Sequence, residues 1–151
     1  MSFVISGGGA FRGALKAMTD RTDAATKAAT ATGAHLIEAE TKKALSTYAH
    51  PKGTRTPSPA GSPPAVVSGQ LRRSITVEGP RAIGGGTYEA KIGPTAVYGR
   101  IQELGGPIWT GAQLPPRPYL APTVNALITS GRLRDVYVTA WGTAFSGTGV
   151  F

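Results

Sequence analysis

The stretch VYGRIQELGGPIWTGAQLPPRPYLAPTV, residues 97–124, decides how the rest of the chain is organised. Its first part has helical spacing, because Val97, Ile101 and Leu104 fall on one face of a 3.6-residue period. We expect this helix to end at the Gly-Gly-Pro that follows. Glycine closes helices in the left-handed conformation, and proline cannot continue one. The stretch therefore begins with a short helix that ends abruptly.

A loop of about a dozen residues comes next, long enough that such loops in compact domains are usually functional or disordered. It carries one large aromatic residue, Trp109, which we expect to be a buried anchor, and this argues against disorder. Residues 115–118, Pro-Pro-Arg-Pro, form a stiff extended segment. Tyr119, Leu120 and Pro122 then begin a second helix, whose first turn tolerates proline.

Upstream, residues 10–49 place small and apolar side chains in steps of three and four, which predicts one long helix that Pro51 ends. The residues at these steps, which form a stripe along one face of the helix, are mostly alanine and threonine. These residues allow close approach but bury little area, so the helix must pack along a sheet or a neighbouring chain. Gly33 is a candidate break in it.

Two strands are predicted between these helices. Ser68 is a candidate N-cap for a short helix through Arg73, which leads into a strand at residues 74–78. Gly79-Pro80 and the glycines at 84–86 flank a long connection, and residues 87–93 return as an alternating strand. We expect an antiparallel pair with one face on the long helix. The predicted fold is therefore α+β, with long N-terminal and C-terminal helices packed on a small, mainly antiparallel sheet with long Gly/Pro-rich loops.

One domain is expected over residues 1–151, with an N-terminal arm at 1–9 and a C-terminal tail at 145–151 that docks on a partner or frays. The proline-rich segment 52–64 is either a flexible surface loop or an extended arm that reaches a neighbouring subunit. Helical spacing continues to Ala144 with a kink at Gly131. The β-prone residues 136–139 leave a strand as the alternative for 133–144.

The composition of the chain limits the kinds of partner and binding site that it can have. Sixteen Lys and Arg against eight acids give a net charge of +8, which suggests nucleic acid or an acidic protein as partner, or only diffuse solubilising charge. The basic residues are spread along the chain, which weakens the case for sequence-specific DNA binding. The absence of cysteine excludes disulfides and thiolate metal sites. The apolar runs are too short to span a membrane, and the N-terminus lacks an export signal pattern.

No group of residues supports catalysis, and we expect no enzyme, cofactor or metal site. His35 and His50 have no acidic neighbours at metal-ligand spacing, and Glu38 and Glu40 point to different sides of a helix. Residues 4–16 resemble the glycine-rich oxyanion loop of patatin-like lipases. However, the chain contains no Gly-x-Ser-x-Gly nucleophile motif.

Three motifs follow one another in a fixed order. SGQLRRSI at residues 68–75 precedes the two predicted strands, Val-Tyr-x-x-x-x-Glu-x-Gly begins at Val97, and Arg-Pro-Tyr-Leu-x-Pro begins at Arg117. This order, over residues 66–130, resembles the tail-completion or head–tail joining family, minor tail components of long-tailed double-stranded DNA bacteriophages. Leu104 departs from the aromatic residue that is more frequent in that family.

The resemblance implies a structural virion protein, made in the bacterial host cytoplasm, that forms a ring at the head-proximal end of the tail. The ring is expected to hold six copies, to complete the tail and to join it to the head. Its partners would be its own copies, neighbouring neck and tail-tube proteins, and genomic DNA that passes without sequence-specific binding. A tail terminator or a head-to-tail stopper is the alternative ring. A basic nucleic-acid-binding module is the alternative of another class, although its usual stripe of cations and stacking aromatics is missing.

Closed rings need heterologous interfaces, and aromatic side chains dominate interface energetics. Trp109 and Tyr119 are therefore interface candidates, with an ordinary core anchor as the alternative for Trp109. The arginines are candidates for interfacial ion pairs, with a solvated charge as the alternative for Arg117. Glu103 is expected to accept hydrogen bonds from loop N–H groups or to pair with Arg117. The full candidate set is Arg72, Arg73, Glu103, Trp109, Arg117 and Tyr119.

Overall fold

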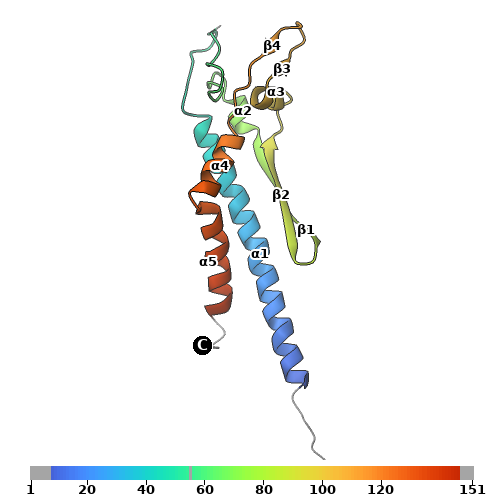
Figure 1. The fold of residues 1–151 in the computed structure, drawn as a ribbon. Helices are drawn as coiled ribbons and strands as arrows, with labels where there is room; N and C mark the ends of the chain where they lie inside the picture. Colours follow the sequence, from blue (N-terminus) through green and yellow to red (C-terminus); the bar gives the residue numbers. More distant parts are fainter. Residues whose placement is uncertain (1–7, 55, 147–151) are drawn as a thin grey trace, which may run out of the picture.

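The structure is a computed structural model that describes residues 8–54 and 56–146. Figure 1 shows an elongated molecule in which the long helix α1 (Gly8–Ala44) has helices at one side and a β-hairpin at the other. The elements along α1 are α4 (Ala121–Thr129), α5 (Arg132–Ser146), β1 (Ile75–Gly84) and β2 (Thr87–Pro94). Four short elements gather where α1 ends: α2 (Gln70–Arg73), α3 (Gly99–Leu104), β3 (Gly106–Pro107) and β4 (Gln113–Leu114). The predicted α+β class is confirmed.

The predicted N-terminal arm and C-terminal tail lie only partly within the described residues. Residues 1–7 of the predicted arm and residues 147–151 of the predicted tail lie outside the described residues. The remaining residues of those two segments belong to α1 and α5. Helix α1 ends before the predicted position 49, because Ser46 N donates to Lys43 O and the chain tightens into turns.

Small side chains allow α5 to lie close against α1. Ala29 and Gly33 are buried in α1, and a Cβ on Gly33 would lie 3.6 Å from Leu133 Cδ2 of α5. Trp141 Nε1 of α5 donates to Thr26 Oγ1 at 3.1 Å. The expected break at Gly33 is therefore wrong, since the helix continues through a position where glycine permits close packing.

The N-terminal part of α1 extends beyond the other elements (Figure 1). Every residue from 8 to 21 is exposed, including the apolar side chains of Phe11, Leu15 and Met18. Their spacing of four and three residues places them on the helix face that α5 covers further along, at Ala29. This stripe has no partner among the described residues.

The β1–β2 hairpin is longer than predicted. Antiparallel pairing runs from Ile75 with Pro94 to Gly84 with Thr87, leaving a two-residue turn whose glycines both have positive φ. The Gly79-Pro80 pair, expected in a long connection, instead lies inside β1 at a shift of register. As predicted, the hairpin packs on α1, where Tyr88 Oη donates to Asp23 Oδ2 at 2.6 Å.

Helix α3 buries a different face from the predicted one. Val97 is 98% exposed and Leu104 is 63% exposed, so the predicted apolar face does not point inward. The helix begins at Gly99, which is buried against the end of β2. A Cβ there would lie 2.4 Å from Pro94 Cγ, so only glycine allows this approach. The Ser68 cap is also displaced, since Gly69 holds the cap position of α2 while Ser68 Oγ accepts from Gln70 N at 3.3 Å.

The C-terminal segment is helical, so the strand alternative for 133–144 is wrong. Gly131, with φ of 77°, separates α4 from α5 and does not merely kink one helix. The compact core lies near the end of α1 and consists of Leu45, Leu71, Ile75 and Tyr119. It joins α1, α2, β1 and the segment before α4.

The proline-rich loop folds back on its own chain. Its two ends are joined where His50 N donates to Val66 O and Val66 N donates to Tyr48 O. In its middle, Gly61 N donates to Pro116 O at 2.9 Å. These hydrogen bonds hold the described part of the loop against its own chain, and its reach toward a neighbouring subunit stays a prediction.

We expect Gly99→Ala to lower the free energy of unfolding by about 2 kcal/mol, the usual cost of forcing one carbon into a packed site. The added methyl would overlap Pro94, whose ring cannot rotate away. Urea denaturation measures the change. Gly93→Ala is the matched control, because nothing lies within 4 Å of its Cβ position and its φ is not positive. Equal stability of the two variants would contradict the close approach of α3 to β2.

Candidate functional site

The six predicted residues all lie at the end of the molecule where α1 terminates, but they do not form one cluster. Glu103 and Tyr119 are joined by a hydrogen bond, and Arg117 N donates to Gln102 O beside them. Arg72 and Arg73 lie on α2, and Trp109 lies between β3 and β4. The structure therefore divides the set into a structural centre, a cationic edge and a projecting aromatic.

Glu103 caps the start of α4 from a different helix. Its carboxylate accepts hydrogen bonds from the backbone N–H groups of Tyr119 at 2.8 Å, Leu120 at 3.0 Å and Ala121 at 2.9 Å. Leu120, at the cap position of α4, supplies no side-chain cap itself. The expected bonding to loop N–H groups is present, whereas no ion pair between Glu103 and Arg117 occurs among residues 8–54 and 56–146.

Arg117 is a buried structural residue. Only 5% of it is exposed, and its Nε donates to Ser58 O of the proline-rich loop at 2.8 Å. A buried cation must have polar partners, and backbone carbonyls can serve. The expectation of a solvated charge is therefore wrong, while the interfacial ion pair stays a prediction.

Tyr119 belongs to the core and not to the surface. It is 1% exposed, and its hydroxyl donates to Gly99 O at 3.1 Å. Burial, followed by the nearby negative charge of Glu103, raises the pKa of the Tyr119 hydroxyl well above its ordinary value of 10.0. The prediction that Tyr119 presents an aromatic ring to a partner is wrong for this arrangement.

Trp109, in contrast to the buried Arg117 and Tyr119, lies on the surface. It is 97% exposed at the tip of the β3–β4 hairpin, so the expected buried anchor is wrong. The hairpin is held by pairing of Gly106 with Leu114 and of Pro107 with Gln113. Ile108 N also donates to Ala112 O at 2.9 Å. An ordered turn thus holds a large aromatic ring in solvent.

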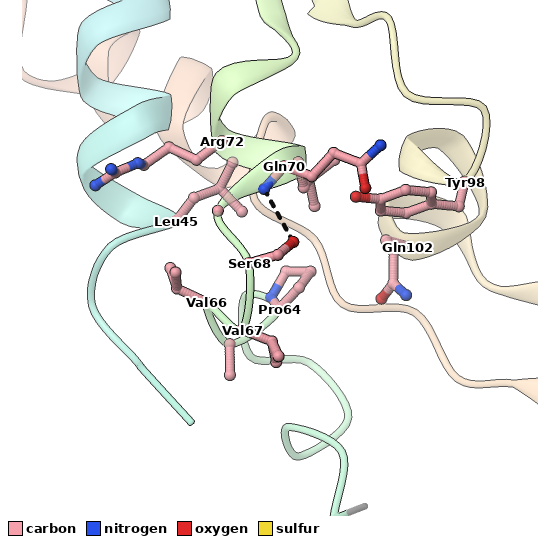
Figure 2. Close-up of a pocket in the computed structure, with 12 residues that line it drawn as sticks. Leu45, Pro64, Val66, Val67, Ser68, Gln70, Arg72, Tyr98 and Gln102 are labelled. Atoms are coloured by element: carbon pink, nitrogen blue, oxygen red, sulfur yellow. Dashed lines mark hydrogen bonds between the residues drawn. The ribbon is translucent and has the colours of Figure 1, made fainter. Parts of the chain in front are cut away.

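A cavity of about 180 Å³ lies between the end of α1, α2 and α3. Figure 2 shows Leu45, Arg72 and Val66 on one side of it, Tyr98 and Gln102 on the other, and Ser68 and Pro64 between them. Gln102 Oε1 is buried and has no hydrogen-bond partner among the described residues. No sequence pattern marked Gln102, because its environment comes from segments far apart in the chain.

A cationic groove adjoins the outer side of α2. It is about 610 Å³ in volume and is lined by Lys42, Lys43, Ser46, Arg72 and Arg73. Arg72 Nη1 donates to Ser46 Oγ at 3.0 Å, and Lys42 pairs with Glu38 at 2.6 Å. Hydrogen bonds with Lys42 and then His35 lower the pKa of Glu38. The positive charge of the groove can attract anions, but its geometry does not select a particular ligand.

The part of the chain that the structure describes holds no group of three or more His, Asp or Glu residues placed to bind a metal ion. His35 contacts Glu38, and Glu40 instead pairs with Arg132 of α5 at 3.0 Å. None of the described helices is long and apolar enough to cross a membrane.

Comparison with known protein families identifies the family of this chain. The family model described as "Bacteriophage HK97-gp10, putative tail-component" matches residues 9–105. The chain belongs to the HK97-gp10-like family. No curated protein and no solved structure matches it.

The HK97-gp10-like match covers α1, the β1–β2 hairpin and α3, and it includes Glu103. It confirms the resemblance to phage tail and head–tail joining proteins. The protein is a structural component of a bacteriophage tail, which places it in the virion among other phage structural proteins. Trp109 and the elements α4 and α5 lie beyond the matched region.

Proposed function

We propose that this tail component forms a ring, of six copies by its resemblance, at the head-proximal end of the tail, where it completes the tail and joins it to the head. The family supports a structural tail role. Closure into a ring requires one surface of each copy to meet a different surface of the next. The chain offers unlike exposed surfaces at its two ends, the α1 stripe and the β3–β4 hairpin.

The exposed N-terminal part of α1 is the observation that carries this proposal. Phe11, Leu15 and Met18 form an apolar stripe on a helix that, at residues 8–21, contacts no other element closely enough to be covered. Helical stability in proteins comes mainly from packing of such a face. A neighbouring copy in a ring would supply the packing that this chain lacks.

The cationic groove fits a channel through which DNA passes. Lys42, Lys43, Arg72 and Arg73 would attract phosphates, and phosphate contacts carry no sequence information. Such a surface would bind DNA weakly and with strong dependence on salt. The groove is also the observation that favours the second candidate, a nucleic-acid-binding module. Tight binding that survives high salt would favour that candidate over the ring.

Electron microscopy of phage particles tests the proposal, using a phage whose gene for this chain carries an early stop codon. We expect DNA-filled heads beside free, unattached tails. Abnormally long tails would instead indicate a terminator, and heads that lose their DNA would indicate a stopper. Complete, infectious virions would overturn the structural role at the joint.

A further inference from the structure

Trp109 is the most exposed large aromatic residue that the structure describes, and its backbone lies in a hydrogen-bonded turn. The β3–β4 pairing holds its turn, and Gly111 N donates to Ile108 O at 2.8 Å across the tip. At the base of the hairpin, a Cβ on Gly105 would lie 2.7 Å from Leu114 O, so the two segments are in close contact. Tryptophan is enriched among residues that dominate binding energy, particularly where it fills a pocket. A solvated tryptophan on an ordered turn therefore suggests a receiving pocket on another molecule.

The cavity beside α2 has the size and lining of such a pocket. Its volume of about 180 Å³ is below the roughly 300–1,000 Å³ of typical small-molecule sites, so it suits one side chain better than a cofactor. Leu45 and Leu71 give it an apolar floor, since both are buried core residues. Val66 and Pro64 line the side toward the proline-rich loop (Figure 2).

The polar groups of this cavity also match an indole ring. Gln102 Oε1 has no partner among residues 8–54 and 56–146, and a buried acceptor left without one is costly. Within residues 8–54 and 56–146 no hydrogen bond holds the side-chain amide of Gln102, so a rotation of this amide can bring the buried oxygen to an occupant. The indole N–H is a donor only, which is what this oxygen lacks. Tyr98 at the rim offers an aromatic edge to the ring, whereas the Arg72 guanidinium points away toward Ser46 (Figure 2).

We propose that Trp109 of one copy inserts into the cavity between α2 and α3 of the next copy and donates its indole N–H to Gln102 Oε1 there. Trp109 does not occupy its own cavity, because its side chain is almost fully exposed. The projecting residue and the pocket are different patches of one chain, so each contact leaves a pocket and a tryptophan free for the next copy. This inference rests on the proposed ring and names a contact by which each copy in the ring binds the next.

Cross-linking tests the contact directly, because the chain has no native cysteine. One full-length variant carries Thr110→Cys, beside Trp109, and the other carries Val67→Cys, at the exposed rim of the cavity. Mixed and oxidised, they should give a disulfide-linked heterodimer at least about tenfold faster than the control pair, since seating raises the effective concentration of the thiols. The control replaces Val67→Cys by Ile83→Cys, which is equally exposed on β1.

Native mass spectrometry measures the energetic contribution. Trp109→Ala should raise the dissociation constant between copies by roughly 30-fold or more, the effect of losing a hot-spot residue. Trp109→Phe should have a smaller effect, because the ring remains and only the N–H is lost. Gln102→Leu should weaken the wild type but add nothing to Trp109→Phe. Val97→Ala is the control, since Val97 is equally exposed.

The outcomes separate the two proposals. A ring that persists unchanged in Trp109→Ala, without the heterodimer, would overturn this inference and leave the proposed ring intact. A phage whose Trp109→Ala protein self-associates normally but fails to join heads would place the pocket on a different protein and also overturn it. A wild-type chain that forms no oligomer in solution and gives no cross-link within virions would overturn both.

Discussion

Replacing Tyr119 by alanine is expected to lower the free energy of unfolding by about 4 kcal/mol, the usual cost of truncating a buried aromatic ring. Tyr119 is 1% exposed and packs with Leu45, Leu71 and Ile75, which together form the compact core of the described chain. Urea denaturation followed by circular dichroism measures the change. Tyr48→Ala is the matched control and should change stability by less than about 0.5 kcal/mol, because its side chain lies on the surface.

The Tyr119 hydroxyl adds a dependence on pH. Because its pKa is raised in the folded state, the unfolded chain releases this proton first as pH rises past about 10, and stability is lost from that point upward. Below pH 10 both states keep the proton, so the hydroxyl contributes no pH dependence there. Tyr119→Phe should cost about 1 kcal/mol at neutral pH for the lost bond to Gly99 O. Relative to this variant, the wild type should lose up to about 1.4 kcal/mol per pH unit above pH 10. Parallel curves for the two proteins would contradict the assignment.

The elements themselves were predictable because local patterns encode them. Steps of three and four residues predicted α1, and alternation with flanking glycines predicted the hairpin. The length of the hairpin was not predictable, because Gly79-Pro80 has the composition of a turn while the pairing continues past it. The stop at Gly105 was predicted correctly, since glycine and proline act within a few residues.

The side-chain environments were less predictable, because they depend on distant segments. Arg117 has the composition of a surface charge, but its partner is the carbonyl of Ser58, 59 residues away along the chain. Trp109 has the size and polarity of a core residue, yet it sits on a two-strand hairpin too short to predict from any periodicity. Glu103 was the exception, since the N–H groups that it binds lie within the same stretch of sequence.

Replacing Glu103 by alanine is expected to lower the free energy of unfolding by about 3 kcal/mol, because three backbone N–H groups lose a charged acceptor at once. For a chain of this length such a loss lowers Tm by roughly 6–12 °C, which differential scanning calorimetry detects. Glu103→Gln keeps one acceptor oxygen and should lose about half as much. Glu78→Ala, which removes an exposed carboxylate on β1, should change stability by less than about 0.5 kcal/mol.

The reason for so large an effect is that Glu103 replaces a local cap. Helix α4 begins at Ala121 after a leucine with no capping side chain, and Pro122 has no N–H to donate. The negative carboxylate also lies at the positive end of the α4 dipole. Amide hydrogen exchange at Tyr119, Leu120 and Ala121 should therefore accelerate in Glu103→Ala even at temperatures where the protein remains folded. Unchanged exchange at these three amides would show that the carboxylate does not hold the start of α4. The tie between α3 and α4 would then have to come from packing around Tyr119 and from the hydrogen bonds of Arg117 N to Gln102 O and of Tyr119 Oη to Gly99 O.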